Sequence, residues 1–164
     1  MIDFRTSGTT GIRRAPLKEY VLMKKVMVFG TFDVLHPGHQ DLFKQAQHHG
    51  NYLVAVVARD STVKRMKNKL PLHNEAMRLA NVRRTKLVDE AVLGHARDYY
   101  AVVEKHRPDV ICLGYDQHSS IADGLKKELA KRRMAVEIVR LNAYKPHTYK
   151  SSKILKKMKK SDRA

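Results

Sequence analysis

Five short apolar runs, rich in β-branched residues, recur along the chain and predict buried strands. They lie at residues 25–29, 52–58, 90–93, 109–113 and 135–140. Segments with helical spacing of apolar positions separate them, at residues 38–48, 74–84, 98–106 and 121–133. Parallel strands that alternate with helices connect through right-handed βαβ crossovers. The pattern therefore predicts a single α/β domain with a Rossmann-like, doubly wound parallel sheet.

The two ends of the chain depart from this pattern. Residues 1–22 combine turn formers with basic residues and show little periodicity, which predicts a flexible basic N-terminal extension. Residues 151–160 place Ile154, Leu155 and Met158 at helical spacing, which predicts an amphipathic terminal helix. We therefore expect the compact domain over residues 23–164, with a basic helix and tail at its C-terminus.

Composition limits the class of protein. With 164 residues, 43% of them hydrophobic, the chain is long enough for one domain with a proper core. Its single cysteine, Cys112, excludes a disulfide framework and favours a reducing compartment. No apolar run approaches the roughly 20 residues that span a bilayer, and the N-terminus lacks the apolar region of a signal peptide. We expect a soluble cytoplasmic protein that does not contact a membrane.

The net charge of +17 first suggests a nucleic-acid partner, but its distribution weakens that interpretation. Residues 1–25 carry six Lys or Arg against two acids, and residues 145–164 carry eight against one. The body between them is only mildly basic. The basic ends are therefore read as solvated tails, with a phosphate-rich ligand or weak RNA contact as the alternative.

The stretch VMVFGTFDVLHPGHQ, residues 26–40, carries the first candidate chemistry. Gly30 follows the first predicted strand and is expected to allow a sharp turn. Pro37 suits the first turn of a helix, and His36 and His39, three residues apart, are expected on one face. Gly38 would let a ligand approach the backbone. A helix N-terminus of this kind favours phosphate, although two surface histidines that cap a helix are the alternative.

Three further blocks follow later strands. After residue 58 comes a segment dense in cations, with Arg59, Lys64, Arg65, Lys67 and Lys69, which predicts either a phosphate-binding loop or a solvated basic loop. Asp60 in this segment also suits an ordinary helix cap. LGYDQ places Gly114 and Asp116 after the fourth strand, and TYKSSKI places Ser151 and Ser152 at the start of the last helix, where Ser151 is a good N-cap.

GTFDVLHPGH resembles the signature of the HxGH nucleotidyltransferase superfamily and of its cytidylyltransferase-like branch. The blocks VARDSTVKRMK, LVDEAVLG, DVICLGYDQ and VEIVRLNAYK resemble the archaeal-type FAD synthases, and the resemblance covers roughly residues 24–154. The arginine-threonine-x-glycine run typical of glycerol-phosphate cytidylyltransferases is missing before Ser151. The C-terminal cysteines typical of archaeal-type FAD synthases are also missing.

The resemblance implies transfer of a nucleotidyl group from an NTP to a phosphate, most simply from ATP to FMN with release of pyrophosphate. Two alternatives stay open: a cytidylyltransferase that uses CTP and glycerol 3-phosphate or another small phosphorylated alcohol, and a non-catalytic RNA-binding module. No metal-ligand cluster is visible in the sequence, so Mg²⁺ or another divalent cation is expected to come with the NTP. The family also implies a homodimer, and a nucleic-acid partner is not expected.

The resemblance also assigns roles to residues. His36 and His39 become the catalytic pair. The residues expected to bind the nucleotide are Gly30, Thr31, Phe32, Gly38, Gly114, Asp116, Ser151 and Ser152. Those expected to bind phosphate or the acceptor are Arg59, Lys64, Lys67, Lys69, Arg78 and Tyr144. For Arg78, a plain surface arginine is the alternative, and Tyr115 with Tyr144 is a candidate lining for a flavin ring.

We predict that deletion of residues 1–22 leaves folding and nucleotidyl transfer intact, because this segment lacks the periodicity of a packed element. Circular dichroism and an activity assay of the truncated protein check this. An insoluble or inactive product would mean that the extension packs on the domain.

Overall fold

The structure is a computed structural model that describes residues 22–117, 119–145, 148 and 153–154. The predicted N-terminal extension, apart from its last residue, lies outside the described residues. Most of the predicted terminal helix does so too, although Lys153 and Ile154 are helical. Among the described residues, no helix is long and apolar enough to cross a membrane.

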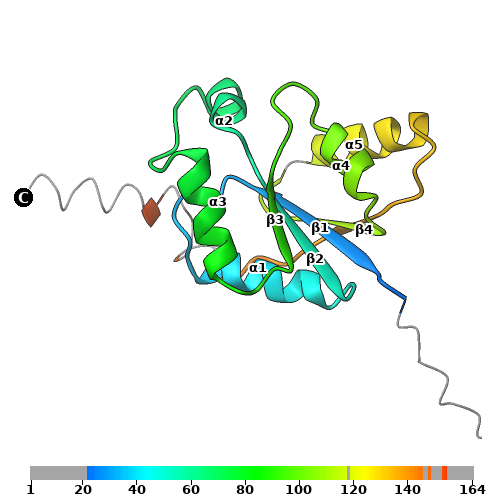
Figure 1. Cartoon of the computed structure of the whole chain (residues 1–164), viewed down its shortest axis with the longest axis horizontal. Helices are drawn as coiled ribbons and strands as arrows, with labels where there is room; N and C mark the ends of the chain where they lie inside the picture. Colours follow the sequence, from blue (N-terminus) through cyan, green and yellow to red (C-terminus); the bar gives the residue numbers. More distant parts are fainter. Residues whose placement is uncertain (1–21, 118, 146–147, 149–152, 155–164) are drawn as a thin grey trace, which may run out of the picture.

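The described chain forms a parallel sheet of five strands with helices between them (Figure 1). The strands are β1 (Lys25–Gly30), β2 (Tyr52–Val57), β3 (Glu90–Leu93), β4 (Val110–Leu113) and β5 (Glu137–Arg140). The helices are α1 (Pro37–Gln47), α2 (Asp60–Lys67), α3 (Glu75–Arg84), α4 (Ala101–His106) and α5 (Ser119–Lys131). The strand order is β3-β2-β1-β4-β5, and every pairing is parallel. The predicted Rossmann-like architecture is confirmed.

Both faces of the sheet are covered, which explains why its strands read as continuous apolar runs. In β1, Val26 and Val28 face a core shared with Phe43 of α1 and Val82 of α3. The alternate residues of β1 face a second core, to which Val103 of α4 and Leu125 and Leu129 of α5 contribute. Helices α1 and α3 therefore cover one face of the sheet, and α4 and α5 cover the other (Figure 1).

The strand order places a topological switch point between β1 and β4. From β1 the chain moves outward through β2 to β3, and it then returns to the other side of β1 to form β4 and β5. The segments that leave β1 and β4 diverge at this point, and ligands of such sheets bind in the crevice beyond the carboxyl ends of the strands. We call this rim of the sheet the carboxyl edge.

One prediction about the elements is wrong. The basic segment after residue 58 was expected to be a loop, but residues 60–67 form α2, with Asp60 as its first residue. The helix has one buried residue, Val63. Two turns with a single apolar contact give too little periodicity to detect from sequence.

Gly50, in the turn between α1 and β2, generates a test of the packing. A Cβ atom added there would overlap the carbonyl oxygen of Lys24 and lie 2.6 Å from Cγ2 of Val26, which is fully buried. We expect Gly50→Ala to lower the free energy of unfolding by about 1–3 kcal/mol, measured in urea. Gly124 is the control, because a Cβ there meets nothing within 4 Å; Gly124→Ala in helix α5 should raise stability by roughly 0.5–1 kcal/mol. Equal effects of the two substitutions would contradict the account.

Candidate active site at the carboxyl edge

The two histidines of the HPGH stretch lie together at the start of α1. His36 is the N-cap, and its Nδ1 accepts a hydrogen bond from the backbone N–H of Gly38 at 3.1 Å. Pro37 is the first helical residue, as predicted. The imidazole rings of His36 and His39 stack with their centroids 3.9 Å apart and 26° between their planes. The expectation that both rings share one side of the helix start is confirmed.

Both imidazoles are held in the neutral form. Burial, the nearby His36 and the charge of Lys67 together lower the pKa of His39 to about 3, with the backbone of Val34 acting in the opposite direction. Burial also lowers the pKa of His36, while the carboxylate of Asp116 acts in the opposite direction. Near neutral pH each ring therefore offers one N–H donor. Nδ1 of His39 is buried and has no hydrogen-bond partner in the described part of the chain.

The turn after β1 differs from the predicted one. No described glycine has a positive φ; Phe32 takes the left-handed conformation, with φ 51°. Gly30 is needed for space, because a Cβ there would lie 2.6 Å from the Phe32 ring. That ring is 2% exposed and contacts the rings of His39 and Phe43, each at a centroid distance of 5.3 Å. Phe32 therefore supports His39 from the core side.

Lys67 brings the end of α2 to the histidine pair. Its Nζ donates a hydrogen bond to the hydroxyl of Thr31 at 3.2 Å, and its charge acts on His39. Lys64 and Lys69 are exposed, and no described contact brings either to the histidines. Of the three lysines in the predicted cation set, Lys67 is the one that the structure joins to this site.

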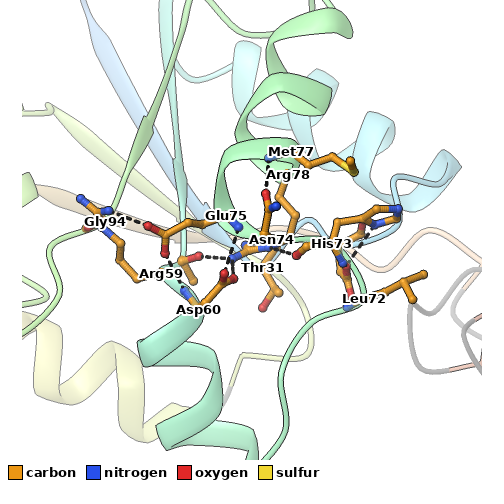
Figure 2. Close-up of polar contacts among 12 residues, drawn as sticks. Thr31, Arg59, Asp60, Leu72, His73, Asn74, Glu75, Met77, Arg78 and Gly94 are labelled. Atoms are coloured by element: carbon orange, nitrogen blue, oxygen red, sulfur yellow. Dashed lines mark hydrogen bonds and ion pairs between the residues drawn. The ribbon is translucent and has the colours of Figure 1, made fainter.

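Arg78 is not the surface arginine that its spacing allowed. Its side chain is fully buried, and it donates to three carbonyl oxygens, those of Thr31 at 2.6 Å, Ala58 at 2.7 Å and His73 at 3.0 Å. A fourth bond reaches the carboxylate of Asp60 at 2.7 Å. Figure 2 shows this guanidinium among the residues that follow β1 and β2. With no exposed surface, Arg78 positions the site and does not present its guanidinium to a substrate.

Arg59 is also engaged by the protein. Its Nε donates to the carbonyl of Gly94 at 2.9 Å, and its guanidinium forms an ion pair with Glu75 at 2.7 Å (Figure 2). Glu75 and Asp60 cap each other's helices, because each carboxylate accepts the other residue's backbone N–H, at 2.9 and 3.1 Å. These contacts tie the starts of α2 and α3 to the end of β3. The predicted contact of Arg59 with phosphate stays a prediction.

Asp33 is a functional candidate that sequence reasoning missed. Its carboxylate is 6% exposed and accepts the backbone N–H groups of Leu72, at 2.7 Å, and His73, at 2.9 Å. It therefore holds the α2–α3 connection against the turn after β1. The signal available in the sequence was an acidic residue two positions beyond Thr31, directly after a buried strand.

On the β4 side, Gln117 bridges the two strands at the switch point. Its Oε1 accepts the backbone N–H of Gly114 at 3.0 Å, and its Nε2 donates to the carbonyl of Phe29 at 3.3 Å. Sequence reasoning did not select it. Asp116 is exposed beside it, and its charge acts on His36. The structure thus brings Gly114 and Asp116 to the same edge as the histidines.

For the remaining predicted residues, no described contact joins them to the histidine pair. Tyr144 is half-buried, with Nζ of Lys145 5.6 Å from its ring centroid, and Tyr115 is half-buried next to Asp116. Ser151 and Ser152 lie outside the described residues. Within the described ranges, no group of three or more His, Cys, Asp or Glu could hold a metal ion.

The chain is similar to known proteins over most of its length. A family model described as cytidylyltransferase-like matches residues 27–157. The FAD synthase of Aciduliprofundum boonei is 49% identical over 122 residues, which cover 74% of this chain and 80% of the relative. The FAD synthase of Methanocella arvoryzae is 40% identical over 142 residues, 86% of this chain and 99% of the relative.

A solved structure is also similar. The crystal structure of a lipopolysaccharide core biosynthesis protein from Thermoplasma volcanium has a TM-score of 0.70 and 43% identity, and the match covers 74% of this chain and 98% of that one. The residues matched by the family model include the histidine pair, the β4 turn and nearly all of the sheet. The chain belongs to the cytidylyltransferase-like family, and within it to the archaeal-type FAD synthases.

Proposed function

We propose that this chain is an FMN adenylyltransferase, which joins ATP and FMN to give FAD and pyrophosphate. The observation that carries the proposal is the identity of 40–49% with several FAD synthases over most of the chain. The stacked histidine pair at the switch point supports the proposal, because it places neutral donors at a helix N-terminus, an environment that favours phosphate.

The reaction requires that the two substrates be positioned, and it does not require a strong base to activate the FMN phosphate. The second pKa of a phosphate monoester is about 6, so the FMN phosphate is largely ionised at neutral pH. One of its oxygens attacks the α-phosphorus of ATP in line, the new P–O bond forms, and the bond to the β-phosphate breaks as pyrophosphate leaves. The enzyme must hold both phosphates and stabilise the charge that develops in the transition state.

We assign the histidines to that second task. His36 and His39 each donate one N–H to oxygens of the triphosphate, at the positive end of the α1 helix dipole. Their lowered pKa values keep both imidazoles uncharged near neutral pH. Lys67 supplies the positive charge, since its ammonium already reaches Thr31 next to the pair.

The nucleoside of ATP is proposed to lie on the β4 side, with the backbone of Gly114 and the carboxylate of Asp116 as its contacts. Ser151 and Ser152 stay predicted contacts of the β- and γ-phosphates. Mg²⁺ is proposed to enter with the triphosphate, since Mg²⁺ commonly binds substrate phosphates and keeps several waters. When bound it neutralises charge on the phosphate oxygens. The homodimer and the cytoplasmic location also stay predictions.

His36→Ala and His39→Ala should each reduce the turnover of FAD formation by at least about 10²-fold, as expected for loss of a preorganised transition-state donor. A coupled assay of pyrophosphate release measures the turnover. Lys44→Ala, an exposed residue later on α1, is the control and should keep normal activity. Near-normal turnover in either histidine variant would contradict the catalytic assignment.

The substrate assignment is tested by combining each of four NTPs with FMN, glycerol 3-phosphate and phosphocholine in the presence of Mg²⁺. We expect ATP with FMN to give FAD and pyrophosphate, and CTP with glycerol 3-phosphate to give little product. Liquid chromatography identifies the products. Turnover with CTP and not with ATP would replace the adenylyltransferase with a cytidylyltransferase.

A further inference from the structure

Tyr99 is an aromatic residue at the carboxyl edge to which the proposed reaction has given no role. It lies in residues 94–100, the segment that follows β3, and 38% of it is exposed. Its ring stacks on that of Phe29, with centroids 4.8 Å apart and 29° between the planes. Phe29 is the last residue of β1 before Gly30. One side of the Tyr99 ring is therefore packed against the strand that leads into the histidine pair, and part of the ring stays open to solvent.

The segment that carries Tyr99 is fixed at both ends. Gly94 accepts a hydrogen bond from Nε of Arg59 at 2.9 Å. At the other end, Asp98 accepts the backbone N–H of Tyr100 at 2.8 Å and pairs with Arg132 at 3.5 Å. The guanidinium of Arg132 also lies 5.2 Å from the Tyr100 ring centroid. Ordering an aromatic ring before a ligand arrives reduces the entropic cost of binding.

An anchored ring with exposed surface fits a planar aromatic ligand. Aromatic rings stack in offset arrangements, and stacking contributes to binding for any flat π-system. A single exposed tyrosine is common on protein surfaces. What distinguishes Tyr99 is its contact with Phe29, whose backbone carbonyl accepts the hydrogen bond from Gln117 at the switch point.

The proposed reaction brings two planar rings, adenine and isoalloxazine. Gly114 and Asp116 follow β4, where the nucleoside of ATP is proposed to bind. Tyr99 lies in the connection from β3 to α4 and packs on the end of β1, and no described contact joins it to Gly114 or Asp116. The ring of the acceptor is therefore the one that we assign to Tyr99.

We propose that Tyr99 stacks on the isoalloxazine ring of FMN and is a specificity-determining residue for the acceptor. The inference rests on the proposed function, because FMN is the substrate that brings this ring. It moves the flavin contact away from Tyr115 and Tyr144, the tyrosines that the sequence suggested.

Fluorescence titration of FMN with the full chain tests the proposal, because stacking on an aromatic side chain quenches flavin emission. The variants are Tyr99→Leu, which removes the ring, and Tyr99→Trp, which keeps a stacking surface in a chain that otherwise has no tryptophan. Tyr52→Leu is the matched control, since Tyr52 begins β2 at the opposite edge of the sheet. Circular dichroism verifies folding, and calorimetry gives the Kd for ATP.

Tyr99→Leu should raise the Kd for FMN about tenfold, equivalent to about 1.4 kcal/mol, and reduce the quenching, while the Kd for ATP stays unchanged. Tyr99→Trp should bind FMN at least as well as the wild type, and Tyr52→Leu should match it. Formation of FAD by the wild type together with unchanged FMN affinity in Tyr99→Leu would overturn this inference alone. Weaker ATP binding in place of weaker FMN binding would also overturn it, and a wild type that makes no FAD would remove it together with the proposed function.

Discussion

The buried guanidinium of Arg78 is the interaction on which the carboxyl edge depends. It reaches the carbonyl oxygens of the segments that follow β1 and β2, and that of His73 before α3, and it pairs with Asp60 at the start of α2. Four acceptors around one buried cation satisfy most of its donors and offset the cost of burying the charge. These segments also carry Thr31 and the helix that ends at Lys67, so Arg78 helps to hold the groups next to the histidine pair.

The protonation state of the histidine pair depends on the packing beside it. Phe32, forced into a left-handed conformation and packed under Gly30, presses its ring against His39. Burial then holds His39 neutral, and Lys67 adds to the effect. The start of α1 thus presents uncharged donors next to the ammonium of Lys67, a combination suited to a triphosphate whose charge distribution changes during the reaction. On the other side of β1, Gln117 joins the ends of β1 and β4 across the switch point.

The sequence predicted the sheet, its doubly wound form and the histidine pair, since these depend on local periodicity and on residues close in the chain. It did not predict the short polar helix α2, which buries only Val63. The roles of Arg78, Asp33 and Gln117 could not be predicted from the sequence either. Their partners lie between 3 and 88 residues away, and a hydrogen bond to the backbone of a residue far along the chain leaves no pattern in the sequence. The role of the turn glycine was predicted wrongly for a different reason: Phe32 takes the positive φ angle, and Gly30 leaves space for the Phe32 ring.

The most direct test of this account is the free energy of unfolding of Arg78→Lys, measured in urea with and without substrates. A lysine keeps the charge, but its single ammonium cannot reach the four acceptors. The account predicts a loss of at least about 2 kcal/mol, as expected when buried acceptors and a buried carboxylate lose their partner. Arg65→Lys on the exposed side of α2 should change stability by less than about 0.5 kcal/mol. Wild-type stability of Arg78→Lys, together with a raised KM for ATP or FMN, would contradict the account and make Arg78 a substrate-binding residue.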